Sequence, residues 1–318
     1  MTYSIEQFIQ EASALPPIPQ TAQKALALIR APETNATALA EVLSSDQVMS
    51  AQALRWANSA YYGMEGRIAT VRQAIVVLGM DIIREAIMNS SVSGHFDREL
   101  PGYGLEKGQL WDHALGTAIG ARMISNHCRL HIDEEAYFAG LLCDIGKLVF
   151  DKHLREIDLN RAEWERHSFL EVERACFGMD HASLGAELAC HWQLPQEQVT
   201  AITFHHEPQL ATGCGELAAV IHVANVSMKV LGIGVGIDGL RYPIEESALE
   251  LLGMTWEELF EISEQVRVEL EHTRKAFSLP NELESIEVKT NERKTPKPFY
   301  PSSCGSIESR SRCGDRAR

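Results

Sequence analysis

The feature that most limits the fold of this chain is its hydrophobic periodicity, which is helical from the first residues onward. Residues 3–12, 19–30 and 110–127 place apolar side chains three and four positions apart, which is the spacing of one face of an α-helix. No stretch sustains the alternation of apolar and polar residues typical of strands, although residues 71–78 are ambiguous on pattern alone. The sequence therefore predicts an all-α protein built from many helices.

Single residues mark where some of these helices begin and end. Asp46 can cap a helix that starts at the next residue, and Gly79 is a natural stop between two helices. The segment GIGVGIDGLRYP at 232–243 is expected to form a glycine-rich loop. It matches a dinucleotide-binding fingerprint poorly, because it follows a helical pattern and no β-α-β unit surrounds it.

The helical segments fall into groups that predict one domain over residues 1–280. A polar stretch at 94–108 separates a front helical subdomain, residues 1–98, from a second group of helices at 105–230. Closing helices follow at 243–280. Residues 281–318 are polar, contain Pro, Ser and Arg, and have almost no apolar periodicity, so we expect this tail to be disordered.

The net charge of −15 is unevenly distributed along the chain. Residues 287–318 carry eight basic and four acidic side chains, a balance of +4, which leaves −19 for residues 1–286. The strongly acidic residues 1–286 disfavour binding to nucleic acid or to an anionic membrane, because a protein binds either of these through a clustered basic surface. We therefore expect neither nucleic acid nor membrane among the partners.

The sequence contains nothing that resembles a secretory signal, and its apolar runs are too short to span a bilayer. Its seven cysteines are scattered without paired spacing. An odd, dispersed set is typical of reduced thiols, which predicts a cytoplasmic protein.

Several histidines and one aspartate lie on helix faces that otherwise look buried. Asp144 belongs to an apolar segment, residues 134–150, that is predicted to be a single helix surrounded by protein. A buried carboxylate needs a partner, either Lys147 one turn away or a metal ion. The other candidates are four histidines. His113 lies on a face rich in small residues that would let another helix approach, and His181 follows the cap residue Asp180. His205 and His206 lie where Pro208 ends a helix.

Each of these histidines alone is more often a hydrogen-bonded core residue than a ligand. Together with an aspartate they form a set that suits Fe, Mn, Ni or Zn, and such an ion turns water into a nucleophile near neutral pH. The sequence leaves open whether this chain holds one such metal or none.

Residues 139–150, AGLLCDIGKLVF, resemble the signature helix of the HD superfamily of metal-dependent phosphohydrolases, in which His-Asp is followed by Ile-Gly-Lys. Residues 44–88 resemble the amino-terminal part of HDOD domains, the HD-related output domains of bacterial signalling proteins. The resemblance runs from Leu15 to Gly253 and implies an amino-terminal helical subdomain packed on an HD-like helical core. The motif positions in this sequence are Asp46, Leu54, Arg55, Asn58, Ser59, Ala74 to Gly79, Gly146 and Lys147.

The same resemblance implies a ligand set with two substitutions. The retained positions are His113, Asp144, His181, His205 and His206. Cys143 stands where the pattern has histidine, and Asn225 stands where an active relative has aspartate. Cys143 is either a soft ligand or, as free cysteine usually is, a small apolar residue on a buried helix.

Three functions follow from this pattern. The leading hypothesis is a non-catalytic signal-transduction output or interaction domain with a degenerate metal site. It would bind a signalling protein, or a small signalling ligand in a cleft between the front helices and the core. The alternative is a metal-dependent phosphohydrolase or phosphodiesterase that uses the five retained ligands. A third possibility is a redox or metal sensor that acts through Cys143.

Overall fold

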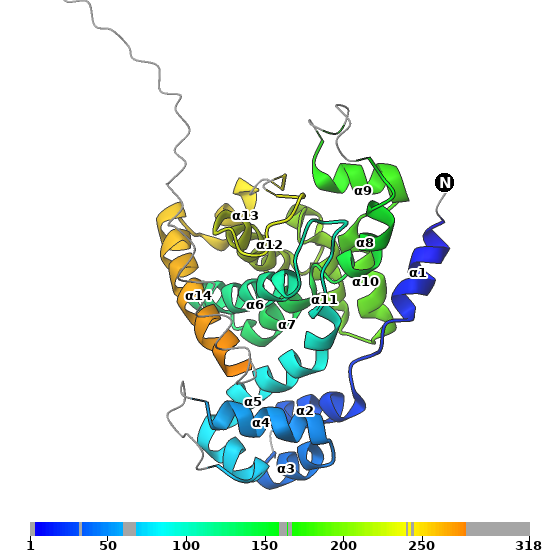
Figure 1. The fold of residues 1–318 in the computed structure, drawn as a ribbon. Coiled ribbons are helices and arrows are strands. Elements are labelled where there is room, and N and C mark those ends of the chain that lie inside the picture. The colour runs from blue at the N-terminus through cyan, green and yellow to red at the C-terminus, as the bar shows by residue number, and fades with distance from the viewer. Residues whose placement is uncertain are drawn as a thin grey trace, which may run out of the picture. The chain divides into compact units, whose positions relative to one another are not determined.

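The computed structural model describes residues 4–31, 34–59, 68–158, 164, 167–239, 241–242 and 245–277. Within these ranges every regular element is helical, and the one pairing of extended backbone is an isolated bridge between Leu100 and Leu105. The prediction of an all-α, multi-helix fold is therefore confirmed (Figure 1). The predicted tail at 281–318 lies outside the described residues.

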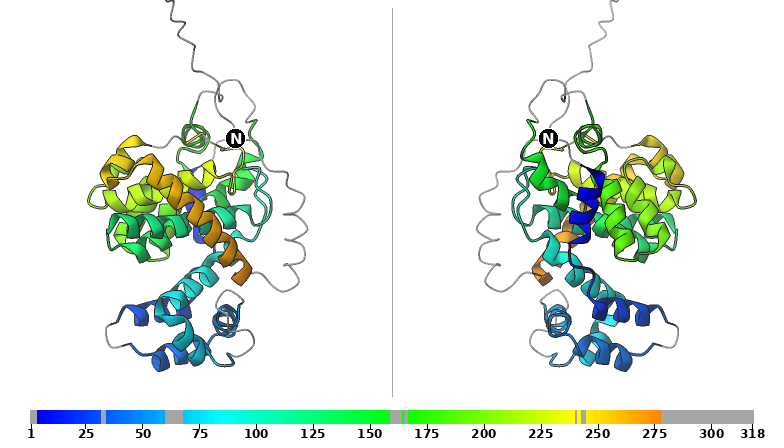
Figure 2. Two further views of the ribbon diagram at one scale, coloured as in Figure 1. Left: turned by 90° about the vertical axis from the view of Figure 1, so that its left-hand side faces the viewer. Right: turned by 90° about the vertical axis from the view of Figure 1, so that its right-hand side faces the viewer.

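Three short helices pack on a long one at the front of the molecule. The short ones are α2 (Gln20–Arg30), α3 (Ala36–Ser44) and α4 (Gln47–Ala57), and the long one is α5 (Val71–Phe96). Asp46 caps α4 as its position predicts, because its Oδ1 accepts hydrogen bonds from the backbone N–H groups of Val48 and Met49. Figure 2 shows this front group around α5, and α4 also contacts the later helix α14 (Trp256–Phe277).

α5 changes direction at Gly79, where φ is 83° and ψ is 169°. A side chain disfavours positive φ, so glycine is the residue that tolerates this interruption. The predicted stop between two helices therefore occurs at the expected residue. The ambiguous residues 71–78 form the first two turns of α5, and the capping box of Thr70 and Gln73 fixes where it begins.

The remaining helices form the core that carries the site. They are α1 (Ile5–Ser13), α6 (Gln109–Cys128), α7 (Asp133–Leu142), α8 (Lys147–Leu154), α9 (Phe169–Phe177), α10 (His181–His191), α11 (Gln196–Phe204), the short 3₁₀ helix η3 (Pro208–Leu210), α12 (Gly215–Val230), α13 (Glu246–Leu252) and α14 (Trp256–Phe277). α1 packs against α8 and α10, and its Phe8 meets the rings of Phe150 on α8 and Phe177 on α9 edge-on. The amino-terminal helix is thus a part of the core packing.

Small residues on α6 allow α12 to approach closely. A Cβ added at Gly120 would lie 3.4 Å from the Cβ of Ala224, and one at Gly116 would lie 2.5 Å from the sulfur of Met228. The face that holds these glycines also carries His113. The expected close approach of another helix to this face is therefore observed, and it brings α12 alongside His113.

The predicted single helix over residues 134–150 is wrong. α7 ends at Leu142 and α8 begins at Lys147, and residues 143–146 form a turn between them. Two hydrogen bonds between residues three positions apart hold the turn, whereas an α-helix joins residues four apart. The N–H of Ile145 donates to the carbonyl of Leu142, and the N–H of Lys147 donates to the carbonyl of Asp144. The apolar pattern could not register this break, because the segment is buried on both sides of it.

Candidate functional site

The turn after α7 sets the position of Asp144. Gly146 in this turn lies so close to α10 that an added Cβ would be 2.1 Å from the carbonyl oxygen of His181. Only glycine permits that approach, so the motif glycine is needed for packing. Its consequence is that the Asp144 carboxylate points to the start of α10.

Four side chains surround the Asp144 carboxylate. The Nε2 atoms of His113 and His181 lie 3.1 Å from its two oxygens, Oδ2 and Oδ1 respectively. The Nζ of Lys147 lies 3.1 Å from Oδ1, and the side-chain amide of Asn225 donates to Oδ2 at 3.0 Å. All five residues are buried. Asp144 is therefore the centre of the site.

The paired histidines at the end of α11 turn toward the same centre. His205 and His206 follow the last residue of α11, and their ring centroids are 3.9 Å apart. The Nε2 of His206 lies 3.1 Å from the Nε2 of His181, and the Nε2 of His205 lies 3.9 Å from Oδ1 of Asp144. One ligand atom from each of Asp144, His181, His205 and His206 lies within 4.8 Å of the others.

The two substituted positions contact each other. The Asn225 amide donates to the Cys143 sulfur at 3.4 Å, and the Cys143 thiol donates to the carbonyl of Gly140 at 3.3 Å. Burial raises the pKa of the Cys143 thiol, and the negative charge of Asp144 raises it further. Cys143 is thus a neutral thiol in the core.

Glu173 on α9 is a site residue that the sequence did not reveal. Its Oε2 accepts two hydrogen bonds from His181, one from the backbone N–H at 2.9 Å and one from Nδ1 at 2.7 Å. Its other oxygen accepts a hydrogen bond of 2.6 Å from the hydroxyl of Tyr103. A carboxylate in this position fixes the orientation of the imidazole and favours its protonated form. The capping box of Ser168 and Glu171 could have signalled α9 itself.

The predicted glycine-rich loop covers the site with its residues Ile233, Asp238 and Tyr242. His113 donates from Nδ1 to the carbonyl of Ile233 at 2.9 Å, and Asp238 accepts from Lys147 at 2.8 Å. The ring of Tyr242 stacks on His206 with centroids 4.4 Å apart. The Nζ of Lys229 lies 3.5 Å from the centre of the same ring, a cation–π contact.

The glycines of this segment are explained by its close approach to α6 and the loop before it. A Cβ at Gly234 would lie 2.4 Å from the carbonyl oxygen of Gln109, and one at Gly236 would lie 2.1 Å from that of Tyr103. The backbone can therefore lie directly over the site only because side chains are missing here. Close packing therefore explains why these positions are glycine, and binding of a dinucleotide is not needed to explain it.

The charges of the site are strongly coupled. Burial would raise the pKa of Asp144, but Lys147 and the hydrogen bonds from His113 and His181 hold it well below its ordinary range. Burial would lower the pKa of His181, but Glu173 and Asp144 raise it to about 9. Asp144 is therefore ionised and His181 protonated at neutral pH.

The remaining groups titrate in the direction that burial dictates. Burial lowers the pKa of His205 to about 3 and that of His206 well below its usual value, so both imidazoles are neutral. Burial and the nearby Lys147 lower the pKa of Lys229 to about 8. Asp238 has its pKa lowered to about 2, because the two lysines outweigh the effect of its burial.

The donor set fits a divalent metal ion in chemistry and in spacing. Three imidazoles and one carboxylate are ligands suited to Fe, Mn, Ni or Zn. The Nε2 of His205 and the Nδ1 of His206 are buried and have no hydrogen-bond partner in the described part of the chain. An ion held there would supply Lewis acidity. To bind it, His181 would have to lose a proton, and the ion would lie near the Lys147 cation.

The other motif residues hold the front helices together, away from this site. The Asn58 amide donates to the carbonyls of Leu54 and Ile68 at 2.9 and 2.7 Å, and its oxygen accepts from the Ile68 N–H at 3.0 Å. The hydroxyl of Ser59 donates to the carbonyl of Trp56. These residues therefore fix the end of α4 and contribute nothing to ligation.

A family model described as HDOD domain matches residues 15–208, more than half of the chain. The chain belongs to the HDOD family. Its curated relatives include an uncharacterised protein of Treponema pallidum (strain Nichols), which is 28% identical over 200 residues. That match covers 61% of this HDOD chain and 38% of the relative, so the chain spans less than half of the relative's length.

Solved structures share the fold of this HDOD chain. An HDOD domain protein with unknown function from Geobacter sulfurreducens has a TM-score of 0.63 at 22% identity, covering 91% of this chain and 99% of that one. A candidate signal transduction protein from Marinobacter aquaeolei has a TM-score of 0.65 at 23% identity, with coverage of 85% and 60%. A candidate phosphohydrolase from Shewanella amazonensis has a TM-score of 0.62 at 24% identity, covering 85% of this chain and 97% of that one. At these identities the likeness shows the fold alone.

The apolar runs of the sequence are too short to predict a membrane-spanning helix. Across the residues that the structure describes, no helix is both long enough and apolar enough to cross a bilayer.

Proposed function

We propose that this HDOD chain is a non-catalytic output domain of signal transduction, which acts by binding a signalling protein or a small signalling ligand. The observation that carries this proposal is the hydrogen bond of 3.0 Å from the Asn225 amide to Asp144. An aspartate at position 225 would place two carboxylates in contact, and a cation would be needed to hold them together. Asparagine replaces that requirement with a hydrogen bond inside the protein.

The charge balance of the buried network supports the same proposal. Its charged groups are paired with one another inside the protein: the carboxylates of Asp144, Glu173 and Asp238 face the cations of Lys147, Lys229 and protonated His181. Buried charges are tolerated when they are paired and hydrogen-bonded. A dication added to this network would have to displace a proton and face two lysines.

Burial of the site argues against turnover of a phosphate ester. Asp144, His181 and His205 are at most 1% exposed, and Tyr242 stacks on His206 at the edge of the group. Hydrolytic metal sites keep one coordination position open to water and substrate. The segment that carries Asp238 and Tyr242 would have to leave its ion pairs and ring contacts before a substrate could reach Asp144.

A metal-dependent phosphohydrolase is the second candidate, and a specific observation favours it. Four ligand atoms lie within 4.8 Å of one another, and two of the histidines have a buried nitrogen without a partner among the described residues. Three protein ligands and an open position are enough for hydrolytic metal sites. This candidate uses the retained ligands His113, Asp144, His181, His205 and His206.

Metal content and turnover distinguish the two candidates. The full chain is purified without chelator or metal-affinity resin, and Fe, Mn, Ni and Zn are measured by elemental mass spectrometry. Phosphomonoesters and cyclic nucleotides are then incubated with the protein and each metal. We expect metal at trace level and no hydrolysis above an Asp144→Ala control.

A variant with Cys143→His and Asn225→Asp provides the matched comparison, because it restores both substituted positions of the HD pattern. We expect it to retain more metal than the natural chain after the same purification, since it adds an imidazole and a carboxylate. Hydrolysis by the natural chain that Asp144→Ala abolishes would overturn the proposed function in favour of the phosphohydrolase.

A further inference from the structure

The outer face of α14 carries two large apolar side chains that the core does not cover. α14 lies at the edge of the core, with α6 and α12 on one side of it (Figure 1). Trp256 is 54% exposed and Phe260 is 66% exposed. They are four positions apart, so they are neighbours on the helix surface. Aromatic residues are enriched at protein interfaces, and an exposed apolar patch marks an interaction site more often than a single exposed side chain does.

The chain around these two rings is strongly acidic. Residues 242–266 contain seven glutamates and no lysine, arginine or histidine. Two of the glutamates are already paired, Glu258 with His127 at 3.3 Å and Glu264 with Arg267 at 2.7 Å. The rings therefore lie in a surface region where carboxylates outnumber cations.

Glu257 and Glu261 are the exposed glutamates next to the rings. Each directly follows one of the two aromatic residues, and neither forms an ion pair within the described ranges. They are four positions apart, and like charges at that spacing repel each other on a helix. The face thus presents an aromatic pair and, beside it, an acidic pair that lacks a cation.

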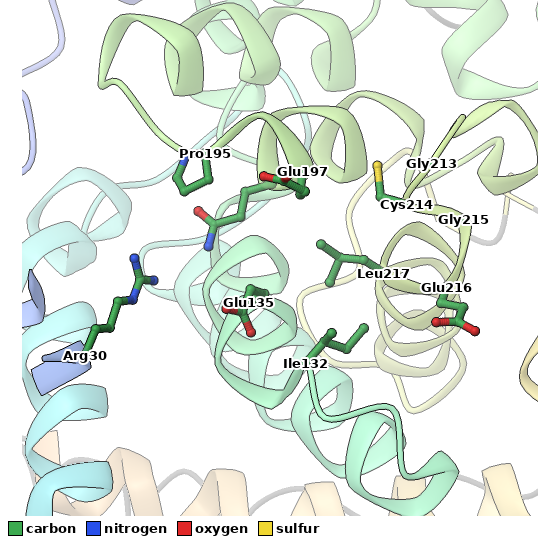
Figure 3. Close-up of a pocket in the computed structure, with 11 residues that line it drawn as sticks. Arg30, Ile132, Glu135, Pro195, Glu197, Gly213, Cys214, Gly215, Glu216 and Leu217 are labelled. Atoms are coloured by element: carbon green, nitrogen blue, oxygen red, sulfur yellow. The ribbon is translucent and has the colours of Figure 1, made fainter. Parts of the chain in front are cut away.

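The acidic surroundings extend beyond α14 in two directions. A hollow of about 370 Å³ between α6 and α14 is lined in part by Glu258 and Glu261. α13 packs on α12, and a cleft of about 460 Å³ at the start of α12 (Figure 3) has three acidic and one basic side chain in its lining: Glu135, Glu197, Glu216 and Arg30. A partner that covers the rings and reaches either hollow therefore meets more carboxylates than cations.

This charge selects among the possible occupants of the face. A second copy of the chain, placed symmetrically on this face, would bring the same glutamates against one another, and like charges across an interface disfavour association. A neutral apolar segment would remove water from Glu257 and Glu261 without supplying a cation, which costs free energy. A basic segment avoids both costs, because its lysine or arginine side chains pair with the two carboxylates.

We propose that the outer face of α14, at Trp256 and Phe260, is the docking site for a basic amphipathic helix of a partner protein. The apolar side of that helix covers the two rings, and its basic side chains pair with Glu257 and Glu261. The inference rests on the proposed function, because it names the kind of signalling protein that the output domain binds.

Fluorescence anisotropy of labelled peptides, titrated with the full chain, tests the proposal. The probe is an acetylated peptide of about 14 residues, the repeat Leu-Lys-Lys-Leu-Leu-Lys-Leu written twice, which is long enough to form a helix on binding. A second peptide has alanine in place of leucine and the same charge, and a third has glutamate in place of lysine. We expect saturable binding of the first peptide, binding of the second that is weaker by about tenfold or more, and none of the third.

Variants of the aromatic pair show where the peptide binds. Trp256→Ala and Phe260→Ala should each weaken binding of the first peptide by about tenfold or more, because buried aromatic side chains carry much of the binding free energy at interfaces. Both residues are exposed, so neither substitution disturbs the core. Val76→Ala is the matched control, since it shortens a side chain that is 69% exposed on α5, and it should leave binding unchanged.

Variants of the acidic pair separate docking from general attraction between a basic peptide and an acidic protein. Glu257→Gln combined with Glu261→Gln should weaken binding by about twofold to fivefold, as for exposed ion pairs. Glu6→Gln combined with Glu187→Gln removes the same charge from exposed positions on α1 and α10, and should leave binding unchanged.

Three results would overturn the docking site: no binding of the first peptide, equal binding of the first and second peptides, or equal effects of the two glutamate pairs. Sedimentation of the free chain tests the second-copy alternative, and a dimer that Trp256→Ala dissociates would also overturn the proposal. None of these results bears on the chemistry at Asp144. Hydrolysis that Asp144→Ala abolishes would overturn the non-catalytic proposal, and the α14 variants would still decide where the peptide binds.

Discussion

The Nζ of Lys147 lies 3.1 Å from Oδ1 of Asp144, and both side chains are buried. The same ammonium group is 2.8 Å from Asp238 in the segment that covers the site. Of the two partners that the sequence allowed for Asp144, lysine or metal, the lysine is in contact. It also joins the centre of the site to its cover, so the two are parts of one ion-pair network.

Replacement of Lys147 should therefore destabilise the whole fold. Lys147→Met keeps most of the apolar stem but leaves Asp144 and Asp238 without their shared cation. We expect the free energy of unfolding to fall by about 3–5 kcal/mol, the usual cost of removing one partner of a buried pair. Urea unfolding followed by circular dichroism measures this change.

Lys152→Met is the control on the same helix. Lys152 is 57% exposed and pairs with Glu11 at 2.9 Å, so its removal should cost less than about 1 kcal/mol. Equal effects of the two substitutions would mean that Lys147 contributes no more than a surface pair.

The thiol of Cys143 should be inert in the native protein. It is fully buried and its pKa is raised by burial and by Asp144, whereas reactive thiols are exposed and have lowered pKa values. Iodoacetamide followed by peptide mass spectrometry should label the exposed Cys190 and leave Cys143 unmodified until urea is added. Rapid labelling of Cys143 in the folded chain would support the redox-sensor hypothesis instead.

Local signals in the sequence predicted those parts of the site that depend on local structure. The Asp180 side chain caps α10 through the N–H of Ser183, at 2.7 Å, and thereby places His181 at the first helical position. Pro208 follows the end of α11, where His205 and His206 turn inward. Caps and prolines act within a few residues, so their effects can be read from the chain itself.

Contacts between distant residues could not be predicted in this way. Glu173 and Tyr103 are 70 positions apart, and Lys147 and Asp238 are 91 apart. The break after Leu142 likewise depends on Gly146 meeting the carbonyl of His181 on another helix. Apolar periodicity reports which face of a segment is buried, but it does not report which partner covers that face.

The glycine-rich segment allows a direct test of its packing. Gly236→Ala would place a Cβ 2.1 Å from the backbone carbonyl of Tyr103, and that oxygen cannot move without the loop. We expect a loss of stability of about 1–3 kcal/mol, as for other overpacked positions. Gly94→Ala is the control, because nothing lies within 4 Å of its added Cβ on α5, and it should stabilise by up to about 1 kcal/mol. Thermal unfolding of both variants distinguishes packing from a general intolerance of substitution.

The raised pKa of His181 predicts that this side chain contributes less to the stability of the metal-free protein as the pH rises from 6.5. The unfolded histidine loses its proton near 6.5, but the folded one keeps it until about 9, so the stabilisation is complete below 6.5 and declines above it. Lys229 acts in the opposite direction from about pH 8 upward, because its folded pKa lies below its ordinary value of 10.5. The buried His205, His206 and His222 have lowered pKa values and also act in the opposite direction, up to about pH 7.5. The contribution of His181 is therefore measured as a difference from a variant that lacks it.

Urea unfolding between about pH 6.5 and 8 should show the free energy of unfolding of the natural chain falling by up to about 2 kcal/mol relative to that of His181→Gln, in which the other buried histidines are unchanged. His127→Gln, which changes a histidine 40% exposed beside Glu258, should follow the natural chain. A slope unchanged in His181→Gln would show that the imidazole is neutral in the folded protein.

Two tyrosines next to the site differ in whether their hydroxyl groups are satisfied, and this predicts opposite effects of the same substitution. The Tyr103 hydroxyl donates to Glu173 at 2.6 Å, so Tyr103→Phe should cost about 1–3 kcal/mol, because it leaves a buried carboxylate oxygen without its donor. The Tyr242 hydroxyl is buried with no hydrogen-bond partner in the described ranges, so Tyr242→Phe should be neutral or stabilising. Chemical denaturation of the two variants measures the difference. Equal losses would mean that the Tyr242 hydroxyl has a bonding partner, and that this covering segment is held by more than ring contacts.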